Sequence, residues 1–234
     1  MSNIAIVEKI ATALGDLKEK MVFVGGSVAE LYADFPEISD IRPTIDVDCF
    51  LELHTYFSYT KLEEELRSLG FKDDTTQGAP ICRKIYQGIK VDFMPDDENV
   101  LGFSNCWYAD GIKNKEKITL PNEIDIYILS IEYYLATKFE ALKGRGGTDI
   151  RSSHDWEDIV YIMGNCVNLV NAIKQCDNTQ LVEYLQKQYF KLLQNNNIRE
   201  IILSALPYNS EEENIDDILK IMNEIKNNRL LQTH

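Results

Sequence analysis

The chain has 234 residues, a formal net charge of −14 and 44% hydrophobic residues. This length is enough to bury a core in one large domain or two small ones, and the hydrophobic content excludes an intrinsically disordered protein. The acidic balance argues against a protein that binds long nucleic acids with its general surface.

No apolar run approaches the roughly 20 residues of a membrane span, so we expect no membrane partner. The first residues lack the basic start and apolar block of a signal peptide, which predicts a cytoplasmic protein. The five cysteines form no Cys-x-x-Cys pair and are scattered through apolar stretches. This pattern predicts free, mostly buried thiols and argues against zinc or a disulfide framework.

The first half of the chain alternates helical and strand signals. An apolar stripe predicts a helix over 4–14, which Gly15 ends. A strand over 21–24 leads into a Gly25-Gly26-Ser27 turn and a short helix over 27–32. A strand over 44–51 follows.

The next segment carries a capping pattern and a hairpin pattern. Thr60-Lys61-Leu62-Glu63 predicts the start of a helix that ends at Gly70. Strands over 81–87 and 89–94 are separated by Gly88 and predict a hairpin. A further short strand is expected over 117–120.

From about Ile126 the pattern becomes helical. Six helices are expected, over 128–143, 153–163, 166–175, 180–193, 197–205 and 211–226. Ser210-Glu211-Glu212-Glu213 resembles a capping box for the last of them. The sequence therefore predicts an α+β protein with a mixed-sheet domain over 1–125 and a helical subdomain over 126–234.

Two acidic residues separated by one position lie on the strand expected over 44–51. Side chains at i and i+2 of a strand share a face, so Asp46 and Asp48 would lie side by side. Two like charges this close are costly unless a cation lies between them. Oxygen ligands suit Mg²⁺, which commonly takes one or two carboxylates and leaves other positions to water and phosphates.

The turn before this strand offers a second part of such a site. Gly25, Gly26 and Ser27 follow an apolar strand, and backbone N–H groups with a hydroxyl suit a phosphate. Asp92 lies in the later strand and supplies a third carboxylate. Each feature also has an ordinary explanation: a tight connection for the glycines, and a solvated strand face for each acid.

The order of these features resembles the nucleotidyltransferase superfamily, and within it the AbiEii-type toxins of abortive-infection toxin–antitoxin systems. The resemblance covers most of the first 165 residues and includes Lys138–Arg145 and the acidic helix start at 153–158. It implies a polymerase-β-like core, an NTP substrate, Mg²⁺ held by Asp46, Asp48 and Asp92, and a cognate antitoxin. The segment between Ser27 and Asp46 is longer than in compact members, and we expect it to form a loop at the mouth of the site.

Lys138 lies on the apolar stripe of the helix expected over 128–143. The resemblance assigns its ammonium group to the nucleotide phosphates, and Arg145 could neutralise charge further along. The alternative for Lys138 is a side chain whose stem packs while its ammonium group reaches water. Either way, Lys138→Met is expected to retain most of the stem's contacts and therefore most of the stability.

An aspartate after this lysine matters in the related toxins, and Asp155 and Asp158 are both candidates. For Asp155 the alternative is a helix-capping role, because Ser152-Ser153-His154-Asp155 resembles a capping box. Arg83 is a candidate phosphate or base contact, although an exposed strand arginine is the commoner explanation. We also expect Lys138 to approach Asp155 or Asp158 when nucleotide is absent.

Three functions are consistent with the sequence. The first is transfer of a nucleotide to an acceptor such as tRNA or another RNA, for which basic residues in 113–117 and 138–151 could provide contacts. The second is a small-molecule nucleotidyltransferase resembling those that act on aminoglycosides, with Asp34, Glu37 and Asp40 forming an acidic lip. The third is a catalytically silent partner-binding protein.

Overall fold

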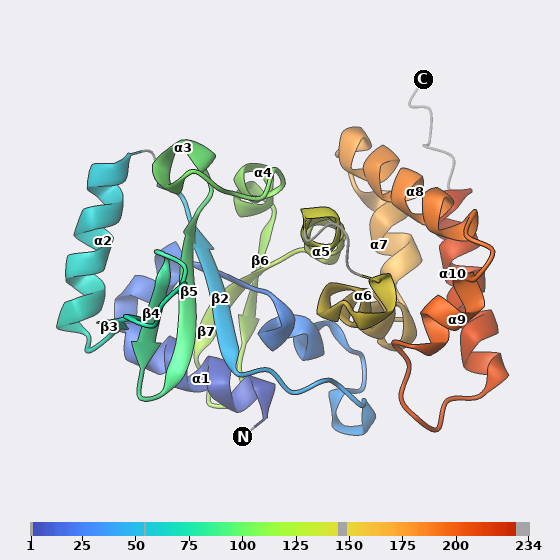
Figure 1. Ribbon diagram of the computed structural model, residues 1–234, viewed down its shortest axis with the longest axis horizontal. Helices are drawn as coiled ribbons and strands as arrows, with labels where there is room; N and C mark the ends of the chain where they lie inside the picture. Colours follow the sequence, from blue (N-terminus) through green and yellow to red (C-terminus); the bar gives the residue numbers. More distant parts are fainter. Residues whose placement is uncertain (1, 54, 145–148, 228–234) are drawn as a thin grey trace. The chain divides into compact units, whose positions relative to one another are not determined.

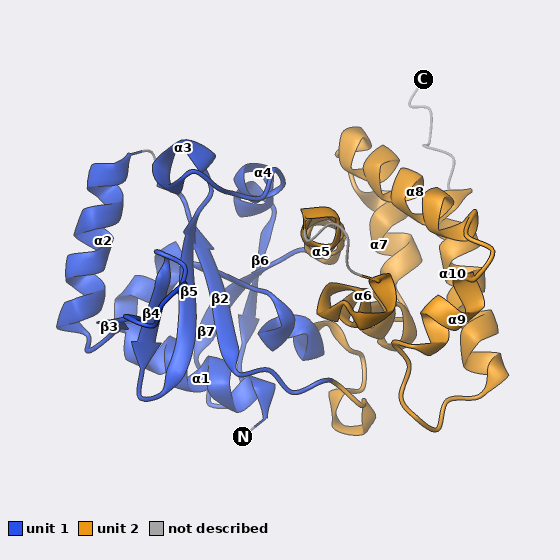
Figure 2. Cartoon of the chain, in the orientation of Figure 1, with its two compact units in different colours: residues 1–31, 42–130 blue, residues 32–41, 131–234 orange. Residues whose placement is uncertain are grey.

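The computed structural model describes residues 2–53, 55–144 and 149–227, which form two compact units (Figures 1 and 2). The first unit comprises 1–31 and 42–130, and the second comprises 32–41 and 131–234. The domain boundary expected between residues 125 and 126 falls just after the first residue of strand β7. This strand belongs to the sheet of the first unit, where it lies between β1 and β6.

A seven-stranded mixed sheet forms the centre of the first unit, in the order β3-β4-β5-β2-β1-β7-β6. The strands are β1 Val22–Val24, β2 Asp46–Leu51, β3 Lys72–Asp73, β4 Arg83–Tyr86, β5 Ile89–Pro95, β6 Lys115–Thr119 and β7 Asp125–Leu129. The β2–β5 and β1–β7 pairs are parallel, and the other pairs are antiparallel. The α+β class with a mixed sheet is therefore confirmed.

The first unit contains the three helical segments predicted before residue 70, together with η1, α3 and α4, which the sequence pattern did not predict. They are α1 Asn3–Leu14, the 3-10 helices η1 Gly15–Lys20 and η2 Gly26–Tyr32, α2 Tyr56–Ser68, α3 Glu98–Leu101 and α4 Tyr108–Lys113. Gly15 ends α1 with φ 54°, a conformation that favours glycine. The segment expected to be an α-helix over 27–32 is a tighter 3-10 helix.

Helix α2 begins four residues earlier than its sequence pattern predicts. Its N-cap is Thr55, whose hydroxyl accepts a hydrogen bond from the Ser58 N–H at 3.1 Å. The extra turn brings Tyr59 into the apolar stripe of Leu62 and Leu66, and all three are buried. Burial of this aromatic ring therefore outweighs the capping pattern at Thr60.

The hairpin predicted over 81–94 is confirmed. In the next hairpin, β6–β7, only the first strand was predicted. Strands β4 and β5 pair antiparallel around Gln87 and Gly88, both with positive φ. Strand β7 lies where the sequence indicated helix, and it pairs with β6. Its alternating burial, with Ile126 and Ile128 buried, is the period of a strand.

The second unit is helical. It contains η3 Pro36–Ile38, α5 Ile131–Gly144, η4 Ile150–Ser152, α6 His154–Asn165, α7 Leu169–Gln175, α8 Thr179–Leu193, α9 Ile198–Leu203 and α10 Glu212–Lys226. Trp156 of α6 is fully buried and donates its indole N–H to the Ile201 carbonyl at 2.8 Å, which ties α6 to α9. The cap of α10 is Glu211 rather than Ser210, because the Asn214 side chain accepts the Glu211 N–H at 2.8 Å.

None of the helices in the described ranges is long and apolar enough to cross a membrane. All five cysteines are free thiols; Cys49 and Cys82 are buried, whereas Cys106 is exposed. Burial raises the pKa of the Cys82 thiol to about 12, with a further contribution from the nearby Asp92 charge. This thiol is therefore protonated and unreactive near neutral pH.

A buried lysine joins α2 to the outer strands of the sheet. Lys84 of β4 is 2% exposed, and its ammonium group binds Glu63 of α2 and Asp73 of β3, the latter at 2.5 Å. The Lys84 hydrogen bond is the largest factor that lowers the pKa of Asp73. Two acids from different elements thus share one desolvated cation.

Lys84→Met should lower the free energy of unfolding by about 1–2 kcal/mol, because two charge-assisted hydrogen bonds are lost while the half-exposed Asp73 carboxylate stays hydrated. Denaturant unfolding measures this loss, and Lys72→Met on the exposed β3 strand is the control. A group with a lowered folded-state pKa stabilises the fold above its unfolded pKa and loses that effect in acid. Wild-type stability should therefore fall below about pH 4, and the variant should show less of this fall.

Candidate functional site

Three aspartates lie on one face of two neighbouring strands in the first unit. Asp46 and Asp48 are two residues apart in β2, and the parallel register pairs Asp48 with Asp92 of β5. Directly paired residues of adjacent strands share a face, and neighbouring strands lie about 4.8 Å apart. The expectation that Asp92 faces the same side as Asp46 and Asp48 therefore agrees with the observed register.

The carboxylate of Asp48 lies directly against the backbone of Gly25. A Cβ atom at residue 25 would come within 2.1 Å of the Asp48 Oδ2 atom. Gly25 also has φ 76°, a conformation that L side chains rarely adopt. Because β1 and β2 pair Val24 with Asp48, the turn after β1 brings its glycine onto this carboxylate.

A relay of polar contacts orients Asp46. The Thr44 hydroxyl donates to Asp46 Oδ1 at 2.6 Å. The Asn3 side chain holds the same segment, because it accepts the Thr44 N–H and donates to the Arg42 carbonyl, both at 2.9 Å. Neither residue was predicted from the sequence; the signal for Thr44 was its position two residues before Asp46, but Asn3 had none.

Arg83 binds Asp92 through both carboxylate oxygens. The Nε atom of Arg83 donates to Oδ1 at 2.8 Å and its Nη2 atom donates to Oδ2 at 2.7 Å. This hydrogen-bonded pair raises the pKa of Arg83, and the charges of Asp46 and Asp48 raise it further. Arg83 is therefore the protein's own counter-ion for the acidic face.

The donor set fits one hard divalent cation better than it fits two. Asp46 and Asp48 offer the two carboxylates that Mg²⁺ commonly takes, and the Asp46 Oδ2 atom has no hydrogen bond to a described residue. Both oxygens of Asp92 already bind Arg83. In keeping with this, the described part of the chain contains no group of three acidic, histidine or cysteine side chains arranged to hold a metal.

Ser27 is positioned by the end of β1. Its side chain is buried, and its hydroxyl donates to the Val24 carbonyl at 3.3 Å. A hydroxyl in this arrangement keeps its acceptor lone pairs for other groups, whereas phosphate binding would require it to turn away from Val24.

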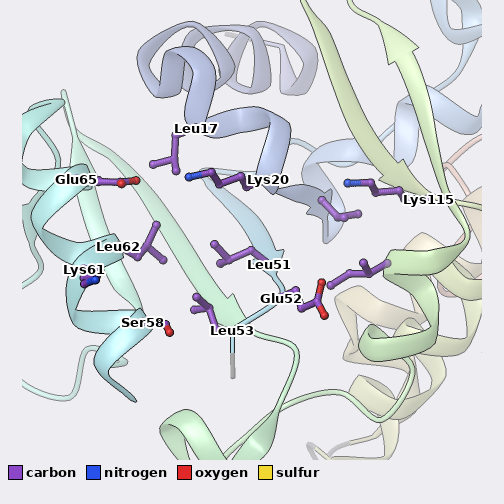
Figure 3. A pocket seen from close by; sticks show the side chains of 12 residues that line it. Leu17, Lys20, Leu51, Glu52, Leu53, Ser58, Lys61, Leu62, Glu65 and Lys115 are labelled. Carbon is purple, nitrogen blue, oxygen red and sulfur yellow. The ribbon is translucent and has the colours of Figure 1, made fainter. Parts of the chain in front are cut away.

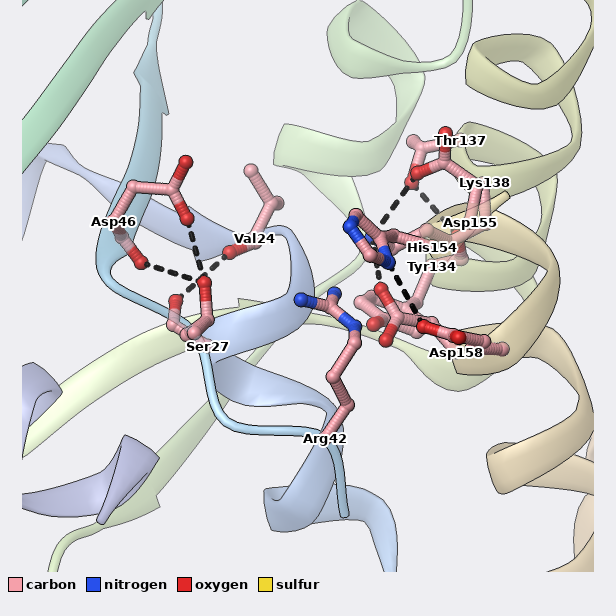
Figure 4. A network of polar contacts seen from close by, with 12 residues as sticks. Val24, Ser27, Arg42, Asp46, Tyr134, Thr137, Lys138, His154, Asp155 and Asp158 are labelled. Atoms are coloured by element: carbon pink, nitrogen blue, oxygen red, sulfur yellow. Dashed lines mark hydrogen bonds and ion pairs between the residues drawn. The ribbon is translucent and has the colours of Figure 1, made fainter. Parts of the chain in front are cut away.

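In the second unit, Lys138 forms a buried cluster with two acids. Its Nζ atom lies 2.5 Å from Asp158 Oδ2 and 3.4 Å from Asp155 Oδ1 (Figure 4). The three residues are 7%, 2% and 3% exposed, respectively. The expected approach of Lys138 to these acids is thus observed, and Asp155 contacts Lys138 although it lies in the first turn of α6.

The basic residues expected to receive nucleic acid are largely paired within the chain. Lys113 binds Asp110, Lys117 binds Asp125, and Lys143 binds Glu140, at 2.6 to 2.9 Å. Arg151 binds Asp149 at 2.5 Å. Arg145 lies outside the described residues.

The long segment between Ser27 and Asp46 contributes to the second unit. The Asp34 carboxylate accepts the Val167 N–H at 2.6 Å, and its own N–H donates to the Asn165 carbonyl at 2.9 Å. Ser39 shares a 2.6 Å hydrogen bond with the Tyr161 hydroxyl. Asp34 therefore holds the end of α6, which leaves it poorly suited to an acidic lip.

Comparisons with known proteins establish no family. Neither a scan against protein-family models nor a search of curated proteins finds a match. Among solved structures, the chain is similar to an antigenic nucleotidyltransferase-like protein from Paracoccidioides brasiliensis, with 15% identity and a TM-score of 0.49. The match covers 87% of this chain and 93% of that chain. At this score the similarity does not assign an activity, so the functional conclusion depends on the chain's own residues.

Gly25→Ala should reduce stability through two separable effects. A side chain at positive φ costs about 1–2 kcal/mol, and contact with the Asp48 carboxylate adds to this cost. In an Asp48→Ala background only the first effect should remain. Gly78→Ala is the matched control, since Gly78 has φ 84° and open space around it. Equal costs for Gly25→Ala in both backgrounds, measured by denaturant unfolding, would contradict the observed contact.

Lys138→Met should destabilise the protein by about 3–5 kcal/mol, because it leaves Asp155 and Asp158 buried without their cation. This revises the expectation from sequence that methionine would preserve stability. Changing both aspartates to asparagine in the Lys138→Met variant should restore most of the loss. A Lys138→Met protein as stable as wild type in thermal and denaturant unfolding would show that the cluster is hydrated.

Proposed function

We propose that this protein is a metal-dependent nucleotidyltransferase that transfers a nucleoside monophosphate from an NTP to an acceptor. The main support is the acidic face of the first unit, where Asp46, Asp48 and Asp92 lie together and Gly25 leaves room for Asp48. The register also places Lys90 beside Asp46, so three carboxylates face Arg83 and Lys90, and the formal charge of −1 that remains favours a cation. A protein that only binds partners has no need for this arrangement.

Asp46 and Asp48 would hold Mg²⁺, which would screen the charge of the triphosphate and lower the pKa of the attacking group. The Thr44 hydroxyl keeps Asp46 turned to a fixed orientation, so the oxygen that remains available points in one direction. The Gly25-Gly26 backbone would bind phosphate oxygens beside them. Catalysis of this kind depends mostly on positioning and electrostatic stabilisation.

Arg83 and Asp92 would act as a pair. A guanidinium group makes the same two-pronged contact with a phosphate as with a carboxylate. When the triphosphate binds, Arg83 would move from Asp92 to a phosphate oxygen. Asp92 would then be available to accept the proton of the attacking hydroxyl, or to contact a second cation.

In the second unit, Lys138 would contact the nucleotide phosphates, as the resemblance to AbiEii-type toxins implies. Its ammonium group would exchange the Asp158 hydrogen bond for phosphate oxygens, with Asp155 holding it in place between turnovers. We assign Arg145 a supporting role in neutralising phosphate charge.

The acceptor proposed for testing is RNA, with tRNA first, on the same resemblance. A toxin of this kind would be paired with an antitoxin. The aminoglycoside-type alternative loses part of its support because the carboxylate of Asp34 is bound to the backbone of Val167.

Asp46→Asn with Asp48→Asn should remove metal-dependent NTP binding and lower nucleotide transfer by at least about a hundredfold. Binding is measured by calorimetry with Mg²⁺ and with EDTA, and transfer by labelled NTP incubated with total tRNA or with aminoglycosides. Thr44→Val should weaken metal-dependent binding less than the double variant, and Thr44→Ser should restore it, because serine retains the hydroxyl.

The control carries Asp16→Asn with Glu19→Gln, which removes the same charge from exposed positions of η1. It should bind and transfer as wild type does. Equal NTP affinity with Mg²⁺ and EDTA would refute the metal assignment, and transfer to aminoglycosides alone would replace the proposed acceptor.

A further inference from the structure

A pocket lies in the first unit, apart from Asp46, Asp48 and Asp92 (Figure 3). Its volume is about 440 Å³, and it is lined by residues of η1, α2, α4 and the ends of β1, β2 and β6. Leu51 is the last residue of β2 and Asp46 the first, so about 17 Å of strand separates them at 3.3 Å per residue. Asp48 is nearer, about 10 Å along the strand, but successive side chains of a strand point to opposite faces, so Leu51 lies on the other face of the sheet from Asp46 and Asp48.

The floor of this pocket is apolar. Leu51 at the end of β2, Leu62 of α2 and Leu17 of η1 line it, and each is less than 8% exposed. Leu53 adds a fourth leucine from the segment after β2. A volume of this size with a mainly apolar lining is typical of sites for small organic ligands.

Three lysines from three different elements line the same pocket. Figure 3 shows the side chains of Lys20 and Lys115 along one side of the pocket, and Lys61 lines it from α2. The Lys115 ammonium lies 4.0 Å from the centre of the Tyr127 ring, and that of Lys61 lies 4.6 Å from the Phe57 ring. None of the three forms an ion pair with a carboxylate within the described ranges. Three such ammonium groups in a chain of net charge −14 favour an anionic ligand.

The acids of the pocket restrict the charge of that ligand. Glu52 and Glu65 also line it, so its five charged side chains sum to +1. A triphosphate would bring more negative charge than the lysines can balance and would meet two like charges. A single anionic group on an apolar body matches both the floor and the net charge.

We infer that this pocket binds an amphipathic organic monoanion, an apolar ring or chain that carries one carboxylate-like group. The apolar body would lie on Leu51 and Leu62, and the anionic group would be placed between Lys20 and Lys115. Ser58 of α2 provides a hydroxyl at the same wall. The inference is independent of the proposed nucleotidyl transfer.

Fluorescence titration with anilinonaphthalene sulfonate, an aromatic monoanion, tests this site. Wild-type protein should bind it with a stoichiometry of one. Lys20→Gln with Lys115→Gln should weaken binding at least tenfold, whereas the neutral probe phenylnaphthylamine should bind both proteins within twofold. Lys9→Gln with Lys72→Gln removes the same charge elsewhere and should leave both titrations unchanged.

Absence of sulfonate binding, or equal sulfonate affinity in wild type and the pocket variant, would overturn the inference. Equal loss of both probes would also overturn it, since it would mean a disturbed floor rather than a lost charge contact. Asp46→Asn with Asp48→Asn should leave the sulfonate titration unchanged. Failure of the nucleotidyl-transfer assay thus has no bearing on this result.

Discussion

The contact between the Asp48 carboxylate and the Gly25 backbone is the constraint on which the candidate site depends. A Cβ atom at residue 25 would lie 2.1 Å from Asp48 Oδ2, so any other residue there would have to displace the Asp48 side chain and adopt a positive φ. The antiparallel β1–β2 pair brings the turn onto Asp48, and the parallel β2–β5 pair brings Asp92 beside it. The Gly25-Gly26 turn and the acidic face are therefore parts of one packing arrangement.

Within that arrangement the negative charge is distributed unevenly. Arg83 takes both oxygens of Asp92, whereas Asp46 is oriented by a neutral hydroxyl from Thr44. A neutral donor fixes the direction of a carboxylate without cancelling its charge, and a guanidinium does both. Asp46 therefore keeps its full charge in a fixed orientation, and the proposed metal site includes it for this reason.

In the buried cluster of the second unit, the charges also contribute to the stability of the fold. Lys138 is held by two acids that are themselves almost inaccessible, so its charge is needed for stability as well as for the proposed phosphate contact. Removing one member of such a cluster leaves an uncompensated charge in a medium of low polarity. Activity lost on substitution of Lys138 is thus interpretable only together with a measurement of folding.

The sequence by itself determined the local elements and the candidate acids. Gly15 marked the end of α1 and Gly88 marked the β4–β5 turn, and both glycines have positive φ in the structure. The two-residue spacing placed Asp46 and Asp48 on one face of a strand. These features could be predicted because they depend on neighbouring residues alone. Tertiary structure decided the rest: Tyr59 extended α2, β7 formed where helix was expected, and Arg83 met Asp92. Contacts between residues far apart in the chain depend on strand order and register, which no local pattern contains.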